Sequence, residues 1–295
     1  MSANSASSSA SASLHFPASI ADAYDAELGS ALFAPCARDL VARLPATPLT
    51  GRRILEVACG TGRLTRELCD RFMSTDADAS VDAAHTTTIV ATDLSEGMLD
   101  VARVAVSASS ESAAFAVASR TLTFERADAQ ALPFADASFD LIVAQFGYML
   151  MGDRAQALAE ARRVLKPAGA FVFSVWADPA RCTFFRVVCD VVATFVAAPC
   201  ESTTAALRHL LGAAHTMSDS ETTCADLSKA GFAIVSVARV ALAVADTARL
   251  ARGIVLGSPY RTFVPPHETA TCIAAVQTAL GAAGTFEVVV YHATI

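Results

Sequence analysis

The sequence predicts an α/β fold in which a doubly wound, mostly parallel sheet is covered by helices. Three observations predict it. Short apolar segments alternate with longer segments of helical periodicity, an order typical of βαβ units. A glycine turn follows the first apolar segment, and acidic residues stand at or just past the ends of the first three. The five expected strands are residues 54–57, 89–93, 122–129, 139–145 and 170–176.

The first strand and the turn after it form the most informative stretch of the chain. Residues 54–57 are mostly apolar and branched, which suits a strand buried on both faces. Gly60 and Gly62 lack the side chains that would keep a ligand away from the backbone. A helix expected over 63–72 presents its positive N-terminal end at the same place. The turn therefore predicts a site for a nucleotide-like ligand, with an ordinary tight turn as the alternative.

Two known patterns compete for this turn. Dinucleotide dehydrogenases require a third glycine where this chain has Thr65, so their pattern fails. The run Glu56-x-Ala58-x-Gly60-x-Gly62 instead resembles motif I of the class I S-adenosylmethionine-dependent methyltransferases, with Ala58 in place of the first glycine. The resemblance implies S-adenosyl-L-methionine as cofactor. It also assigns these four residues to the binding of its methionine end.

The second strand ends in an acid. Asp93 stands 31 residues beyond Gly62 (93 − 62), whereas a ribose-binding acid is expected after roughly 20 residues. A polar insertion over 73–88 accounts for the difference. The segment that begins at Asp93 resembles the ribose-contacting segment of the family. The resemblance implies that Asp93, Leu94 and Met98 bind the cofactor, against the alternative of an exposed acid.

The third strand is also followed by an acid, Asp128. In the family that Glu56 and the glycines resemble, an acid at this place caps the adenine amino group, and the next residue meets the ring through its backbone. The resemblance therefore assigns Asp128 and Ala129 to the adenine. The alternative is a solvated acid in a turn.

The fourth strand lacks the Asp/Asn-Pro-Pro-aromatic run that DNA amino-methyltransferases carry at its end, which disfavours nucleobase amines as acceptors. Gln145, Phe146 and Tyr148 stand there instead. The resemblance places these residues beside the transferred methyl group. Gln145 is expected to contact the cofactor, and Gln145 and Tyr148 are candidates for orienting a polar substrate. The alternative is that the two aromatic rings only pack.

A further candidate precedes the first strand. Residues 20–44 have the apolar spacing of an amphipathic helix, which Pro35 is expected to break into two pieces. Comparable segments of the resembled family lie across the cofactor site. Tyr24 is therefore a candidate lid or substrate contact, or else a packed aromatic residue on a covering helix.

The helix before the fifth strand adds a specific resemblance. The join Arg163-Val164-Leu165-Lys166-Pro167-x-Gly169 matches the family's helix-to-strand connection, with Gly169 expected just past the helix end. The family has a Rossmann-like sheet of seven strands, the last of them antiparallel, and the segments 232–244 and 286–295 fit its last two strands. Helical patterns over 178–214 and 245–283 then form a cap. Among methyltransferases, the chain most resembles those of ubiquinone and menaquinone biosynthesis.

Composition limits the organisation of the chain. Residues 1–13 are almost all Ser and Ala and are expected to be disordered. Residues 14–295 are expected to form one methyltransferase domain, with a cofactor-binding core over 14–180 and the cap helices with the last two strands over 181–295. No apolar run is long enough for a membrane span, so no integral membrane association is expected. The eight cysteines show no metal-binding spacing, and no metal is expected.

Charge and cysteine usage also bear on partners and location. The formal net charge of −7 argues against nucleic acid as a partner. Reduced thiols favour a cytoplasmic protein, with a mitochondrial location as the alternative. Nothing in the sequence predicts the oligomeric state.

Taken with the resemblance, these patterns predict methyl transfer by in-line displacement to a small, hydrophobic or amphipathic acceptor. Whether oxygen, nitrogen or carbon is methylated stays open, because no residue stands out as a general base. Two other functions stay open as well. One is an NAD-type oxidoreductase, which Thr65 disfavours, and the other is a partner protein that binds S-adenosylmethionine without turning it over.

Overall fold

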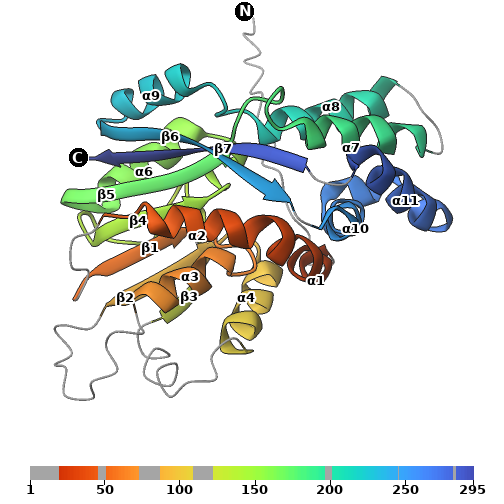
Figure 1. The fold of residues 1–295 in the computed structure, drawn as a ribbon. Helices are drawn as coiled ribbons and strands as arrows, with labels where there is room; N and C mark the ends of the chain where they lie inside the picture. The colour runs from red at the N-terminus through yellow and green to blue at the C-terminus, as the bar shows by residue number, and fades with distance from the viewer. Residues whose placement is uncertain are drawn as a thin grey trace, which may run out of the picture.

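The computed structural model describes residues 20–45, 51–72, 87–108, 122–196, 201–244, 246–281 and 284–295. The tail predicted over 1–13 and most of the insertion predicted over 73–88 lie outside these residues. The described chain forms one seven-stranded sheet in the order β3-β2-β1-β4-β5-β7-β6 (Figure 1). The strands are β1 Arg53–Val57, β2 Thr88–Asp93, β3 Leu122–Arg126, β4 Phe139–Gln145, β5 Leu165–Trp176, β6 Ala233–Val244 and β7 Gly284–Thr294.

The first five strands are parallel, and β7 pairs antiparallel with both β5 and β6. The predicted sheet, with its antiparallel last strand, is therefore confirmed. Strand β1 lies between β2 and β4, and Leu55 pairs with Val90 on one side and Ile142 on the other. The strand order reverses at this point, and in open α/β sheets ligands bind beyond the carboxyl ends of the strands at such a reversal.

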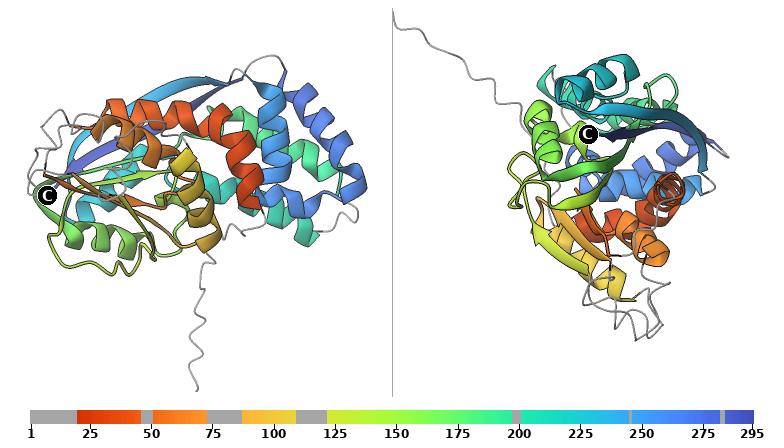
Figure 2. Two further views of the ribbon diagram at one scale, coloured as in Figure 1. Left: turned by 90° about the horizontal axis from the view of Figure 1, so that it is seen from below. Right: turned by 90° about the vertical axis from the view of Figure 1, so that its left-hand side faces the viewer.

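Helices cover both faces of this sheet (Figure 2). Because β1, β2 and β4 are apolar and buried on both faces, each face needs a helical cover. The helices of one face are α1 Ala21–Ala23, the π-helix η2 Tyr24–Phe33, α2 Ala34–Ala42, α3 Arg63–Phe72 and α4 Glu96–Ala108, and those of the other are α6 Arg154–Val164 and α9 Ser220–Lys229.

The remaining helices gather beyond one end of the sheet and form the cap (Figures 1 and 2). They are α7 Thr183–Thr194, α8 Glu201–Ala214, α10 Thr247–Gly257, the 3-10 turns η5 Pro259–Phe263 and η6 Pro266–Glu268, and α11 Thr269–Leu280. A further 3-10 turn, η4 Tyr148–Leu150, follows β4. None of the helices in the described part of the chain is both long and apolar enough to cross a bilayer.

One local expectation was confirmed and another was wrong. The first helical segment does divide at Pro35, since the π-helix η2 ends at Phe33 and α2, with Pro35 in its first turn, begins at Ala34. Gly169 does not cap α6, because β5 already begins at Leu165. The positive φ of this join falls on Ala168, at 62°.

Candidate functional site

A cavity of about 250 Å³ lies at the carboxyl ends of the five parallel strands. Each strand end supplies one of its lining residues. These are Ala58, Asp93, Asp128, Gln145 and Trp176. The parallel sheet thus brings together residues from distant parts of the sequence. The π-helix η2 and the cap helices enclose the other sides.

The turn after β1 opens directly into the cavity. Ala58 and Gly60 both have positive φ, 55° and 54°, a conformation that favours glycine. A Cβ placed on Gly60 would have no atom within 4 Å, so the space above this residue is open. The Gly60 N–H donates a 2.8 Å hydrogen bond to Asp93 Oδ2 and ties the turn to the end of β2.

Two residues of the same motif support the turn from beneath. Glu56 is 1% exposed and is not among the residues that line the cavity. Burial raises the pKa of its carboxyl to about 8, although the hydrogen bond from Thr65 lowers it. Gly62 also faces away, since a Cβ there would lie 3.2 Å from the side chains of Ala102 and Val106. Gly62 therefore allows α4 to pack against the turn.

The ends of β2 and β3 supply the acids of the cavity. Asp93 Oδ1 accepts a 2.9 Å hydrogen bond from the Ser95 N–H, in addition to the bond from Gly60. Leu94 and Met98 also line the cavity.

Beyond β3, Asp128 Oδ1 accepts hydrogen bonds from the Gln130 backbone N–H at 2.9 Å and from its side-chain amide at 3.0 Å. Ala129 and Gln130 line the cavity beside Asp128. The hydrogen bonds from Gln130 hold the Asp128 carboxylate in place. Its Oδ2 accepts only a longer bond, of 3.3 Å, from Gln130 Nε2. Gln130 was not among the predicted site residues.

Gln145 joins the end of β4 to the helix above the cavity. Its Nε2 donates a 2.9 Å hydrogen bond to the Phe33 carbonyl, while its Oε1 is enclosed without a hydrogen-bond partner in the described chain. Tyr24 lines the cavity and stacks on Phe33 with ring centroids 4.8 Å apart. Burial, and next the negative charge of Asp93, raise the pKa of Tyr24.

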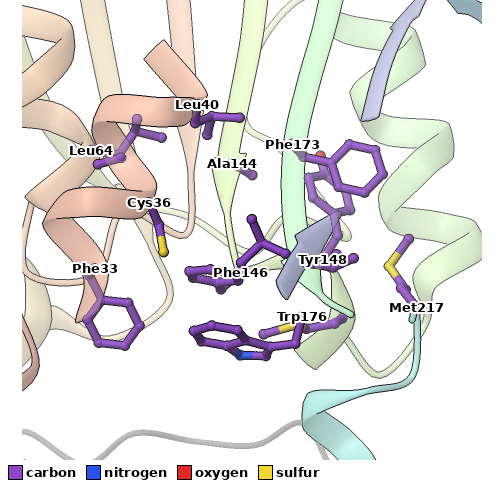
Figure 3. Close-up of a cluster of buried hydrophobic side chains, with 14 of the residues drawn as sticks. Phe33, Cys36, Leu40, Leu64, Ala144, Phe146, Tyr148, Phe173, Trp176 and Met217 are labelled. Carbon is purple, nitrogen blue, oxygen red and sulfur yellow. The ribbon is translucent and has the colours of Figure 1, made fainter. Parts of the chain in front are cut away.

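An aromatic wall continues from Phe33 into the apolar part of the cavity. Figure 3 shows the rings of Phe146 and Trp176 stacked on each other. Their centroids are 3.8 Å apart. Phe146 has a φ of 57°, an uncommon conformation for a non-glycine residue. Phe184 and Phe185 of α7 extend the wall through edge contacts with Trp176.

Tyr148 does not belong to this wall, and it is not among the residues that line the cavity. The turn η4 directs its ring into the core, where it lies edge-on to Phe171 with centroids 5.0 Å apart. The side chain is fully buried, and Figure 3 shows it beside Phe173. Its neighbours Met149 and Leu150 line the cavity instead.

Besides Gln130, the lining residues that sequence reasoning missed include Trp176 and Tyr260. Trp176 is the last residue of β5, and the strand-end reasoning applied to the first four strands would have found it. Tyr260 stands between two cap helices in the turn η5, where no sequence signal distinguished it.

Ion pairs hold η2 against the rest of the molecule. Asp25 accepts hydrogen bonds from Arg63 Nε at 2.9 Å and Nη2 at 2.8 Å, and a longer one of 3.3 Å from Arg66. On its other side, η2 packs closely on α10. A Cβ on Gly253 would lie 2.5 Å from Leu28. The helix over the cavity is thus fastened both to α3 and to the cap.

Comparison with known proteins agrees with this geometry. The family model for the methyltransferase domain matches residues 55–173. A demethylmenaquinone methyltransferase of Clavibacter sepedonicus is 32% identical over 191 residues, which are 64% of this chain and 68% of the relative. This chain belongs to the methyltransferase family.

Further members of the methyltransferase family show how far the similarity reaches. The demethylmenaquinone methyltransferase of Deinococcus radiodurans is 36% identical over 136 residues, 46% of this chain. The match covers 48% of that relative, so the chain spans about half of its length. Phosphoethanolamine N-methyltransferase 2 of Haemonchus contortus, solved with S-adenosyl-L-methionine, has a similar fold. The TM-score is 0.55 at 14% identity, over 93% of this chain and 56% of that one.

Proposed function

We propose that this chain binds S-adenosyl-L-methionine in the cavity and transfers its methyl group to a small hydrophobic or amphipathic acceptor. One observation carries the proposal. A single cavity has carboxylates and a glycine turn at one part of its lining and an aromatic wall at another. Such a cavity suits a polar nucleoside at the strand ends and an apolar acceptor beneath the cap.

The described residues fit such a cofactor. Asp93 and Asp128 both line the cavity, and a carboxylate can accept several hydrogen bonds at once. Asp93 would accept from ribose hydroxyls, and Asp128 with the Ala129 backbone would meet the adenine. The open space above Gly60 would admit the methionine end. The unpartnered Oε1 of Gln145 supports this fit, because an enclosed acceptor without a partner costs free energy until a donor reaches it.

The cofactor would supply a sulfonium methyl group, and the chain's own contribution would be alignment and exclusion of water. Correct alignment can contribute roughly 7–11 kcal/mol to the lowering of the barrier. The ionisable side chains among the described lining residues are Tyr24, Asp93, Asp128 and Tyr260. None of these is a histidine or lysine base, which supports positioning as the main contribution of the protein.

The acceptor class follows from the wall of the cavity. Phe146, Trp176, Phe184 and Phe185 form one continuous aromatic surface. Aromatic side chains bind flat apolar groups through large contact areas. The names of the curated relatives, which act on demethylmenaquinone, support an acceptor of this kind.

The proposal is tested first by binding. Calorimetric titration with S-adenosylhomocysteine should show one site in the wild-type protein and an affinity about tenfold lower or worse in Asp93→Asn. Asp100→Asn is the matched control, because Asp100 lies on α4 with its side chain 69% exposed and pairs with Arg103. Equal affinity in Asp93→Asn would contradict the assignment of Asp93.

Activity is tested with labelled S-adenosylmethionine and two acceptors, a short-chain demethylmenaquinol and ethanolamine. We expect transfer to the quinol only, so transfer to ethanolamine alone would contradict the acceptor class. Stabilisation by NAD(H) without any effect of S-adenosylhomocysteine would indicate the oxidoreductase. Binding without turnover of either acceptor would favour a non-catalytic partner protein.

A further inference from the structure

Tyr260 is the cap's polar contribution to the apolar part of the cavity. It stands at the start of η5, directly after α10, and is 6% exposed. The other cap residues that line the cavity around it are mainly apolar. They include Phe184, Phe185, Leu210, Ala214 and Ile254.

The backbone at Tyr260 is held rigidly against α10. Ser258 Oγ accepts a 3.2 Å hydrogen bond from the Tyr260 N–H and donates one of 2.5 Å to the Ile254 carbonyl. Pro259 lies between them and fixes its own φ at the first position of the turn. A side chain on such a support loses little freedom when it binds a ligand.

The Tyr260 hydroxyl has no hydrogen-bond partner among the residues that the structure describes. It differs from the hydroxyl of Tyr148, which is enclosed in the core. Tyr260 lines the cavity, and its hydroxyl is not among the fully enclosed polar atoms that lack a partner. Burial raises the pKa of this phenol, so it keeps its proton and can donate near neutral pH.

Several other polar groups around the cavity are already engaged. Ser258 uses its hydroxyl within the turn, and the Gln145 amide nitrogen is bonded to Phe33. Asp93 and Asp128 accept backbone bonds at the strand ends, where the nucleoside would lie. Within the described cap, Tyr260 therefore offers the hydroxyl that an acceptor can reach.

We propose that the Tyr260 hydroxyl hydrogen-bonds an oxygen or nitrogen atom of the acceptor and so selects apolar rings that carry such an atom. This inference rests on the proposed function. It makes Tyr260 an acceptor-binding residue that orients the ring along the wall formed by Phe146 and Trp176.

The experiment compares two probes that differ by one hydroxyl group, 1-naphthol and naphthalene. Their dissociation constants are measured by calorimetry with and without saturating S-adenosylhomocysteine. The ratio of naphthalene to 1-naphthol dissociation constants should fall by about 2- to 12-fold from wild type to Tyr260→Phe, which is the range of one hydrogen bond. Naphthalene itself should bind both proteins equally.

Tyr148→Phe is the matched control, because it removes a tyrosine hydroxyl that lies in the core, away from the cavity. Its probe ratio should equal that of the wild type. An unchanged ratio in Tyr260→Phe would overturn the inference, as would an equal loss of both probes, which indicates a structural role. If the protein does not bind S-adenosylhomocysteine, the proposed function is contradicted. The comparison of the two probes in the absence of S-adenosylhomocysteine would still test the role of Tyr260.

Discussion

The hydroxyl of Thr65 donates a 2.7 Å hydrogen bond to the carboxyl group of Glu56, and this bond joins α3 to β1 beneath the glycine turn. Both residues are buried. Thr65 occupies the position where dinucleotide-binding proteins have a glycine that packs the helix on the sheet. Thr65, which does not fit the dinucleotide-binding pattern, is thus the hydrogen-bond partner of Glu56, the acid of the methyltransferase motif.

Thr65→Val should destabilise the fold. Valine keeps the volume but removes the hydroxyl, which leaves a buried carboxyl oxygen of Glu56 without its donor. We expect the free energy of unfolding to fall by about 1–3 kcal/mol, measured by urea denaturation. Thr65→Ser keeps the donor and is the control. An equal loss in both variants would indicate that packing, not the hydrogen bond, matters at this position.

Glu56 should make stability depend on pH. Burial raises the pKa of its carboxyl from 4.5 to about 8, so the folded state binds a proton that the unfolded state has released between these values. Stability from this group is complete below about pH 4.5 and is lost as the pH rises through 8. The loss is at most about 5 kcal/mol.

This dependence is measured as the difference in unfolding free energy between wild type and Glu56→Gln across that pH range. Glutamine does not titrate, so the wild-type protein should lose stability relative to it as the pH rises. A difference that is constant with pH would contradict the raised pKa.

Asp25 should hold the helix that covers the cavity. Asp25→Asn removes the charge that pairs with Arg63 and Arg66, and all three side chains are at most 20% exposed. We expect a loss of about 1–3 kcal/mol in unfolding free energy and faster dissociation of S-adenosylhomocysteine in stopped-flow measurements. The control is Asp39→Asn, whose pair with Arg43 lies within one helix at the surface and is worth about 0.5 kcal/mol or less.

Gly60→Ala should weaken cofactor binding more than it weakens the fold. The added methyl group would stand in the open space of the cavity, and we expect S-adenosylhomocysteine to bind about tenfold more weakly or worse. The positive φ should cost about 1–2 kcal/mol of stability.

Gly281→Ala provides the comparison, because Gly281 also has a positive φ with open space around it and does not line the cavity. The Gly281→Ala variant should be less stable than the wild type and should bind S-adenosylhomocysteine with the same affinity. If Gly60→Ala and Gly281→Ala bind S-adenosylhomocysteine with equal affinity, the ligand does not lie against Gly60.

The sequence predicted the regular part of the fold closely. Helix α3 over 63–72 and strand β4 over 139–145 have the predicted bounds, because each combines a clear periodicity with a recognisable end. The seven-stranded sheet and its antiparallel last strand came from the family resemblance. The π-helical geometry of η2 could not be predicted, because no local pattern marks it. In the structure Gly257 lies against the backbone of Tyr24, and the Arg63 side chain lies against Gly29.

The candidate site was predictable where residues sit at strand ends. Asp93 and Asp128 reach the cavity because parallel strands end at one edge of the sheet. Side-chain direction after a strand end was not predictable, and a turn directs Tyr148 inward. The position of Tyr260 in the cavity lining depends on the tertiary packing of the cap, which no local sequence pattern predicts.

The place of Trp176 has a practical consequence. The chain contains one tryptophan, and this indole forms part of the cavity wall, stacked on Phe146. Its emission therefore arises from the cavity lining alone, with no background from other indoles. Occupancy of the acceptor compartment can be followed by intrinsic fluorescence, without any attached dye.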